Sequence, residues 1–301
     1  MKLGLALTLT TAACWGVLPI ALKLVLQGMD PVTITWYRFA VAALVLGTIL
    51  AVTGGLPTLH SLSRRIWLLL ALATAGLTGN YVLYLVALSH TTPSVAQIVI
   101  QLAPVFLLLG GLIVFRERFS TRQWAGFALF MLGLALFFNR RLPEVLTLST
   151  DTGLGVALLF LAAIVWAAYG LAQKQLARHF RPQQVLWLVY LGAVLVLFPA
   201  ASLGKVRDLN ALQFWMLGFS CANTLIAYGA FAEALKHWEV SRIGAVLALA
   251  PLFTLTCVWG VERFVPGLLD PEGLNALNAF GALLVVGGSG VCALSAADAH
   301  A

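Results

Sequence analysis

Residues Ser94–Arg118 read SVAQIVIQLAPVFLLLGGLIVFRER, and residues Ser241–Arg263 repeat the pattern as SRIGAVLALAPLFTLTCVWGVER. Both stretches begin with serine, carry Leu-Ala-Pro in the middle and end in Glu-Arg after an apolar run. Each is long enough to cross the hydrocarbon core of a bilayer, which takes about 20 apolar residues. The proline interrupts helical hydrogen bonding, and lipid tolerates such a break only where protein or a water-lined cavity satisfies the freed carbonyl. A duplicated, proline-interrupted apolar segment predicts a transporter built from two repeats.

The composition indicates a membrane protein. Hydrophobic residues make up 61% of the 301 residues and charged residues only 10%, with a mean hydropathy of +0.97, whereas soluble domains carry about 25% charged residues. The net charge of +7 lies in short loops between apolar runs, which is typical of a topology signal and argues against nucleic acid as a partner. The cysteines lie inside apolar runs without metal-ligand spacing, so we expect neither disulfides nor a metal site at Cys14, Cys221, Cys257 and Cys292.

Ten apolar runs of membrane length follow one another along the chain. They cover residues 4–27, 33–53, 66–88, 95–115, 122–138, 154–178, 183–203, 212–236, 241–261 and 276–296. The first run begins like a signal peptide but is too long for one, so we expect it to stay in the mature protein. The predicted units are a first repeat at 1–139, a linker loop at 140–153, a second repeat at 154–296 and a tail at 297–301.

Further matches relate the two halves. The matching pairs are Trp15 with Trp166 and Lys23 with Lys174 at a spacing of 151 residues, Tyr81 with Tyr228 at 147, and Gly126 and Gly133 with Gly281 and Gly288 at 155. Five helices per half is an odd number, so the second half enters the membrane upside down relative to the first. We therefore predict an all-α membrane fold of ten transmembrane helices in two inverted repeats, with substrate bound between them.

The lysines and arginines are unevenly distributed over the loops. Eleven of them fall on the side that includes the N-terminus and six on the other side, with Arg38 counted on neither. The richer side normally faces the cytoplasm, so we predict that both termini are cytoplasmic.

These features resemble the drug/metabolite transporter superfamily, in its ten-helix branch built from two EamA-type domains. The resemblance rests on Trp15-Gly16, Tyr37-Arg38-Phe39, the two Leu-Ala-Pro…Glu-Arg blocks and the glycine-rich fifth and tenth helices. It implies a multi-pass protein of the bacterial inner membrane. It also implies a central cavity lined by helices 1, 3, 4, 6, 8 and 9, with helices 5 and 10 at the back. Members move amino acids, nucleobases, vitamins, sugar derivatives and drugs, often outward, and the aromatic amino acid exporters are the first branch to compare.

Polar side chains in mid-membrane are costly and mark candidate binding sites. On a continuous helix Gln97, Gln101 and Pro104 share one face. Ala248 and Pro251 occupy matching places in the second repeat. We expect the glutamines to face the substrate cavity and the two prolines to act as hinges. The alternative is that the glutamines only bond neighbouring helices.

Aromatic side chains with a polar group suit a small amphiphilic substrate, because they can stack on a ring or hold an ammonium group. Besides the glutamines, the residues expected to bind substrate are Trp15, Asn80, Tyr81, Tyr84, Trp166, Tyr169 and Tyr228. The alternative is that the aromatic residues serve packing or form an interface belt. Trp15 and Trp166 lie near the centres of their runs, which weakens the belt explanation.

Three kinds of charged residue lie within the apolar runs. Arg38 is about five residues into the second run, roughly 7 Å deep, and we expect it to snorkel to the headgroups or to pair with an acid such as Asp30. Lys23 and Lys174 lie near opposite membrane faces, where they can snorkel or contact helix ends. Glu233 is expected to pair with Lys236, and proton coupling through Glu233 is the alternative.

The predicted function is secondary transport, without ATP, by alternating access. The expected cargo is amino acids or related amphiphilic compounds, with the protein acting as an exporter or as a facilitator of their diffusion. The alternative is a proton-coupled efflux transporter of drugs or toxic compounds. No hydrolase motif, zinc motif or phosphate-binding loop is found, so we expect no enzymatic activity, no catalytic residue and no cofactor. The expected partners are a small-molecule substrate and the lipid bilayer, and the protein is predicted to be a monomer or a homodimer.

Overall fold

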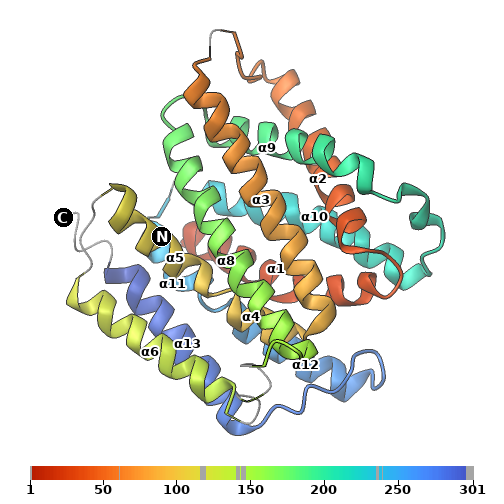
Figure 1. Cartoon of the computed structure of the whole chain (residues 1–301), viewed down its shortest axis with the longest axis vertical. Helices are drawn as coiled ribbons and strands as arrows, with labels where there is room; N and C mark the ends of the chain where they lie inside the picture. Colours follow the sequence, from red (N-terminus) through yellow and green to blue (C-terminus); the bar gives the residue numbers. More distant parts are fainter. Residues whose placement is uncertain are drawn as a thin grey trace.

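A computed structural model describes residues 2–60, 62–115, 120–139, 143, 147–234, 237–238 and 240–295, and these residues form helices and connecting loops without a strand (Figure 1). The first half holds α1 (Lys2–Leu26), α2 (Pro31–Val52), α3 (Arg64–His90), α4 (Pro93–Val99), α5 (Leu102–Phe115) and α6 (Thr121–Phe137). The second half holds α8 (Asp151–Leu176), α9 (Pro182–Leu197), the short helices η1 (Phe198–Ala200) and η2 (Leu203–Arg207), α10 (Ala211–Ala234), α11 (Val240–Leu247), α12 (Ala250–Phe264) and α13 (Ala276–Ser295). The predicted tail and the Glu117-Arg118 end of the first repeated block lie outside the described residues.

Each of the ten predicted runs coincides with one α-helix, or with two α-helices in the runs that contain Leu-Ala-Pro, and the run 183–203 also includes η1. Six helical segments are long and apolar enough to cross a membrane: α1, α2, α3, α8, α9 together with η1, and α10. Large apolar side chains such as Leu44, Val52 and Ile113 are exposed on the outer surface of the bundle, as contact with lipid requires. The number of ten crossings and the side of the termini stay predictions.

Local sequence explains where several helices begin. Asp30 caps α2 by accepting the backbone N–H of Thr33, and Pro31 follows at the first helical position, where a proline costs nothing. Thr92 and Pro93 start α4 in the same way. These turn dipeptides therefore set the ends of the membrane-length runs.

The two halves contact each other at equivalent places. Asn80 of α3 donates its side-chain amide to the carbonyl of Ala162 in α8, at 2.9 Å. Ala227 lies 147 residues after Asn80, and Thr11 lies 151 residues before Ala162. The Thr11 hydroxyl donates to the carbonyl of Ala227, at 3.3 Å. The same interhelical contact is thus made twice, with the donor on opposite partners, and the packing follows the internal repeat.

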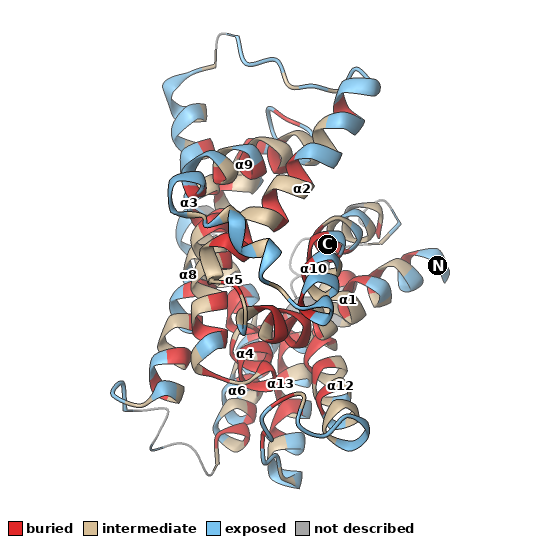
Figure 2. Cartoon of the chain, turned by 90° about the vertical axis from the view of Figure 1, so that its right-hand side faces the viewer, coloured by how far each residue is buried: buried red, intermediate tan, exposed pale blue. Residues whose placement is uncertain are grey.

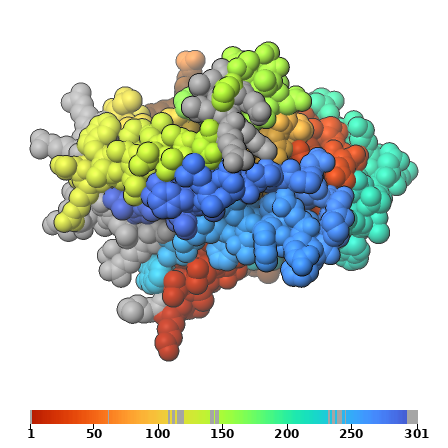
Figure 3. Space-filling view, turned by 90° about the horizontal axis from the view of Figure 1, so that it is seen from below, coloured from red at the N-terminus to blue at the C-terminus, as the bar shows by residue number. Residues whose placement is uncertain are grey.

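Helices α6 and α13 form a separate antiparallel pair at one edge of the bundle (Figures 1 and 3). A Cβ added at Gly133 would lie 2.5 Å from the backbone nitrogen of Val285, and one added at Gly288 would lie 2.4 Å from the nitrogen of Phe130. Glycine is required at these positions because the two backbones approach too closely for any side chain. This pair is the fifth and tenth runs, which were expected at the back of the bundle.

The two ends of the bundle differ. At one end, here called the Lys23 end, side chains join elements of both halves: the Lys23 ammonium donates to the carbonyl of Thr91 at 2.7 Å, and the Tyr37 hydroxyl donates to the carbonyl of Leu203 at 2.8 Å. At the other end the start of α1 and the connection between α2 and α3 lie far apart in the views of Figures 1 and 2. Contacts between the halves occur at that end too, since Gln184 of α9 donates its side-chain amide to the carbonyl of Gly55 at 2.8 Å, so the separation there concerns α1 and the α2–α3 connection.

Candidate functional site: a buried arginine among tyrosines

Arg38 is buried in the centre of the bundle, with 3% of its surface exposed. Its Nε donates to the hydroxyl of Thr224 on α10 at 3.3 Å, and its guanidinium carbon lies 4.5 Å from the centre of the Tyr81 ring on α3. The expectation that Arg38 snorkels or pairs with Asp30 is wrong. Asp30 instead caps α2 and lies 3.9 Å from Lys205. The inward rotamer places a charge between the two repeats.

Five of the six tyrosines gather around this arginine. Tyr84 and Tyr190 lie close enough to Arg38 to interact electrostatically with its charge. Tyr190 also lies close to Tyr81 and Tyr169. Phe39 completes the cluster, with its ring centre 4.6 Å from that of Tyr81 and 5.4 Å from that of Tyr190. The buried hydroxyls of Tyr169 and Tyr190 have no hydrogen-bond partner among the described residues. Donors without acceptors are therefore concentrated at this point.

The centre lies where the two repeats meet. Tyr81 and Tyr228 occupy equivalent positions in the repeats, and their hydroxyls lie close enough to interact. Trp15 lies beside this pair, with its ring centre 5.7 Å from that of Tyr228. Its equivalent, Trp166, packs between the two main buried clusters. The structure thus brings together the four predicted tyrosines, with Trp15 next to them.

Of the remaining predicted polar residues, Gln101 and Asn80 bond neighbouring helices, and Gln97 is buried. The helix that would carry Gln97, Gln101 and Pro104 on one face is broken between α4 and α5, so Gln101 is buried and Pro104 is exposed. Gln101 donates to the carbonyl of Ala248 at 3.3 Å, at the matching break between α11 and α12. The common-face prediction is therefore wrong. Gln101 makes the helix-joining contact of the alternative, and its part in binding substrate stays a prediction. Asn80 bonds α8 in the same manner.

Both prolines follow a break by less than one helical turn. Pro104 comes three residues after Gln101, and Pro251, which is buried, comes three residues after Ala248. The breaks lie opposite each other, because Gln101 and Ala248 are repeat-equivalent and in contact. The hinge role of Pro104 and Pro251 stays a prediction.

Glu233 lies at the end of α10, where its carboxylate is 3.5 Å from the imidazole of His237. The predicted partner Lys236 lies outside the described residues. Glu233 is thus paired near the end of its helix.

Sequence reasoning missed Arg38, Tyr190 and Thr224 as members of the centre. A signal for Arg38 was present, since an arginine inside an apolar run is by default a functional candidate. No comparable signal marked Tyr190, because its repeat-equivalent is Phe39 and an aromatic residue at that position looks like packing.

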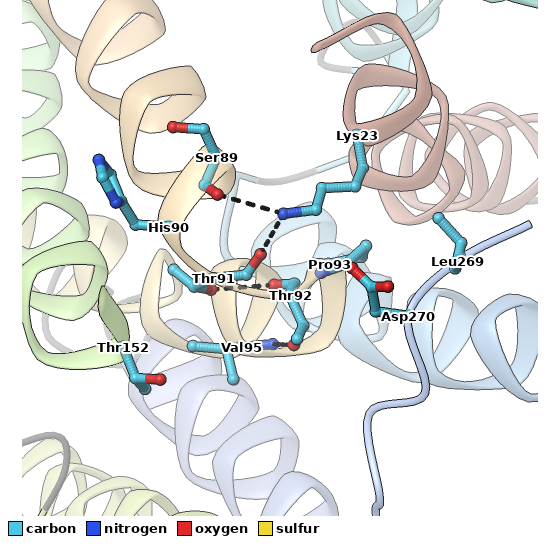
Figure 4. A pocket seen from close by; sticks show the side chains of 10 residues that line it. All are labelled: Lys23, Ser89, His90, Thr91, Thr92, Pro93, Val95, Thr152, Leu269 and Asp270. Carbon is cyan, nitrogen blue, oxygen red and sulfur yellow. Dashed lines mark hydrogen bonds between the residues drawn. The ribbon is translucent and has the colours of Figure 1, made fainter. Parts of the chain in front are cut away.

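The Lys23 end contains a separate pocket of about 230 Å³ (Figure 4). It is lined by the end of α1, the α3–α4 connection and the loop after α12. Lys23 reaches across it to the carbonyls of Ser89 at 3.4 Å and Thr91 at 2.7 Å (Figure 4), and it also donates to the carbonyl of Leu88 at 2.8 Å. None of the predicted substrate-binding residues lines this pocket. It belongs to the closure of this end, and the prediction that Lys23 contacts a helix end is confirmed.

Glu272 lies close to this pocket and is buried, with 2% of its surface exposed. It accepts the backbone N–H of Ser94, at the start of α4, at 3.2 Å. Burial raises the pKa of the Glu272 carboxyl above its ordinary value of 4.5, although the hydrogen bonds from Ser94 and Thr92 act in the opposite direction. The folded protein therefore holds this proton more tightly than the unfolded chain does.

The raised pKa predicts a pH-dependent stability. Folding gains from the Glu272 proton at low pH, and this contribution is lost as the pH rises through the folded pKa. Glu272→Gln removes the titration. The Tm of the variant minus that of the wild type, measured in detergent, should therefore increase as the pH rises from about 4 to 8. Asp208→Asn, at an exposed loop position of the same end, is the control and should show no such trend. A Tm difference for Glu272→Gln that is constant with pH would contradict the prediction.

The family model of the EamA-like transporters matches residues 2–139 and 153–291, once for each half of the chain. The chain belongs to the EamA-like transporter family. It is accordingly a multi-pass transporter of the bacterial inner membrane.

Relatives and a solved structure agree with this assignment. An uncharacterized inner membrane transporter of Escherichia coli (strain K12), YhbE, is 41% identical over 288 residues, which cover 95% of this chain and 90% of the relative. A protein named "Probable amino-acid metabolite efflux pump" from the same strain is 24% identical over 300 residues, covering 94% and 92% of the two chains. A crystal structure matches with a TM-score of 0.65 and 19% identity over 99% of both chains, which shows a common fold.

Proposed function

We propose that this transporter moves amino acids or related amphiphilic metabolites, mainly outward, by alternating access around the centre at Arg38. The observation that carries the proposal is the gathering of a buried arginine and five tyrosines where the repeats meet. In transporters with inverted repeats the substrate binds at this interface, near the middle of the membrane. The name of the relative described as an amino-acid metabolite efflux pump favours the same class of cargo.

The two bundle ends fit such a cycle. The lysine and arginine counts favour cytoplasmic termini, and with that orientation the Lys23 end would be periplasmic. The hydrogen bonds of Lys23 and Glu272 would then close the periplasmic side, while the cytoplasmic ends of α1 and of α2 and α3 are separated. We assign this arrangement to a state that receives substrate from the cytoplasm.

A proton-coupled drug efflux transporter is the weaker candidate. Such a pump needs a titratable carboxylate in its centre. Within the described ranges no carboxylate forms an ion pair with Arg38, and Glu233 lies at the end of α10 beside His237. No specific observation therefore favours drug efflux over metabolite transport.

The test is counterflow uptake into proteoliposomes, with a panel of amino acids, nucleobases and cationic drugs, with and without a proton gradient. We expect gradient-independent exchange of amino acids. Trp15→Ala should slow exchange by about tenfold or more, because Trp15 borders the centre beside Tyr228. Trp215→Ala is the matched control, since Trp215 is 69% exposed on the outer surface. Uptake of drugs alone, and only with the gradient, would overturn the proposal.

A further inference from the structure

We propose that Arg38 binds the carboxylate, or an equivalent anionic group, of the transported molecule, with tyrosine hydroxyls as additional donors. This inference rests on the proposed function and adds the chemical group that the centre recognises. It makes the cargo class amphiphilic acids such as zwitterionic amino acids, rather than amines or neutral compounds.

The hydrogen-bonding capacity of Arg38 is largely unused. A guanidinium carries five N–H donors in a planar fork that matches a carboxylate. In the part of the chain that the structure describes, its hydrogen-bond acceptor is the Thr224 hydroxyl at 3.3 Å, while one face of the group lies on the Tyr81 ring. The fork of terminal nitrogens thus makes no hydrogen bond to the described residues, and a ligand that supplies two oxygens would satisfy it.

Among the described residues, no acid forms an ion pair that balances the charge of Arg38. The described carboxylates that form ion pairs do so with His90, Lys205 and His237, at helix ends and loops. A buried charge is costly unless it is paired and hydrogen-bonded. An anionic ligand would supply the missing partner. The gain from pairing the buried charge of Arg38 would then contribute to the affinity for anionic ligands.

The fold itself does not need a charge at this position. Val189 occupies the position of Arg38 in the second repeat, and Leu77 occupies that of Thr224 in the first. Both of these side chains are fully buried in one apolar cluster. The same helix contact is therefore packed by two hydrocarbon side chains in one repeat and carries an arginine in the other. Packing alone therefore does not explain the arginine, which leaves ligand recognition as its proposed role.

Other donors face the same region. The hydroxyls of Tyr169 and Tyr190 are buried without a described partner, and both side chains are more than nine-tenths buried. Tyr84 and Tyr228 are half-buried, yet they lie deep among protein atoms, so their exposed surface faces the interior of the bundle rather than lipid. A ligand that enters between the helices therefore meets hydroxyls and the guanidinium together.

The experiment compares ligands that differ only at the carboxyl group. Wild-type proteoliposomes are assayed for counterflow with L-phenylalanine, L-phenylalaninamide and 2-phenylethylamine, and with the corresponding series built on leucine and methionine. We expect exchange of the acids at least about tenfold more effective than that of the amides and amines, as the loss of one charge-assisted pair predicts. Arg38→Gln should remove this preference, and Lys205→Met, which changes a half-exposed lysine, should keep it.

Thermal unfolding separates binding from structure. Because Arg38→Gln removes an unbalanced buried charge, its Tm without ligand should equal or exceed that of the wild type. A lower Tm, equal exchange of acids and amides by the wild type, or a preference retained in Arg38→Gln would each overturn the inference and leave the transport proposal standing. If the wild type exchanges the amines but no acid of the three series, the inference and the proposed cargo fail together.

Discussion

Replacing Gly133 by leucine is expected to separate α6 from α13 and to leave little folded protein. A Cβ at this position would lie 2.5 Å from the backbone nitrogen of Val285 and 2.8 Å from the carbonyl oxygen of Gly281. Backbone atoms cannot rotate aside as a side chain can, so the helices must move apart. Overpacking costs about 1–3 kcal/mol where side chains can adjust, which corresponds to a fall in Tm of roughly 3–10 °C. Because the two atoms nearest to this Cβ are backbone atoms, the fall in Tm for Gly133→Leu should reach or exceed about 10 °C.

The measurement is the yield and Tm of purified protein in detergent. Gly290→Leu provides the matched control, because Gly290 lies on α13 as well and a Cβ there meets no atom within 4 Å. Its yield and Tm should match those of the wild type. Equal stability of the two variants would show that α6 and α13 do not pack through this glycine contact.

The repeat and the order of the helices could be predicted because both are written in local sequence. In a bilayer, an apolar run of about 20 residues has few alternatives to forming a transmembrane helix. Asp30 and Pro31 mark the start of a helix because the aspartate caps it and the proline fits its first position. The glycine pair was visible for the same reason, since Gly126 and Gly281 recur at one spacing and small residues allow close approach.

The composition of the centre could be predicted only in part. The tyrosines were found because aromatic residues with a hydroxyl are unusual in mid-membrane, and Tyr81 with Tyr228 repeats. Arg38 was placed wrongly because its depth along the helix says nothing about the side to which its side chain turns. That side is set by Thr224, which is 186 residues away in the chain.

The predicted common face of Gln97, Gln101 and Pro104 was wrong for a different reason. The spacing of Gln97, Gln101 and Pro104 defines a face only if the helix continues through them. The break between α4 and α5 comes before the proline and turns Pro104 away from Gln101. The freed backbone polar groups must find partners, and Gln101 supplies one to Ala248 in the other repeat. Such a partner cannot be read from one segment alone.

Replacing Lys23 by methionine is expected to open the Lys23 end. The Lys23 ammonium donates to the carbonyls of Leu88 at 2.8 Å, Ser89 at 3.4 Å and Thr91 at 2.7 Å. The last carbonyls of a helix have no partner within the helix, and the helix dipole favours a cation there. Methionine keeps the apolar length of the side chain and removes these interactions, which join α1 to α3.

The opening is measured by the rate at which a maleimide labels Val95→Cys, in a background whose four native cysteines are alanine. Val95 is 2% exposed and lines the pocket at this end. A hydrogen bond with a charged group is worth about 1.5–3 kcal/mol, and about 1.4 kcal/mol already changes an equilibrium tenfold. We therefore expect labelling about tenfold faster in Lys23→Met. Lys205→Met is the control at the same end, since its 3.9 Å pair with Asp30 is partly exposed and contributes little.

The second repeat offers a stricter comparison, because Lys174 is the equivalent of Lys23 and lies at the opposite end of the bundle. In inverted-repeat transporters one repeat rocks against the other around a fixed site. Lys174→Met should therefore slow counterflow without making the Val95→Cys label faster. Lys23→Met should slow counterflow as well, but with faster labelling. The same labelling rate in both variants would mean that the two lysines do not act on separate ends, and that closure of the Lys23 end depends on contacts other than those of α1 with α3.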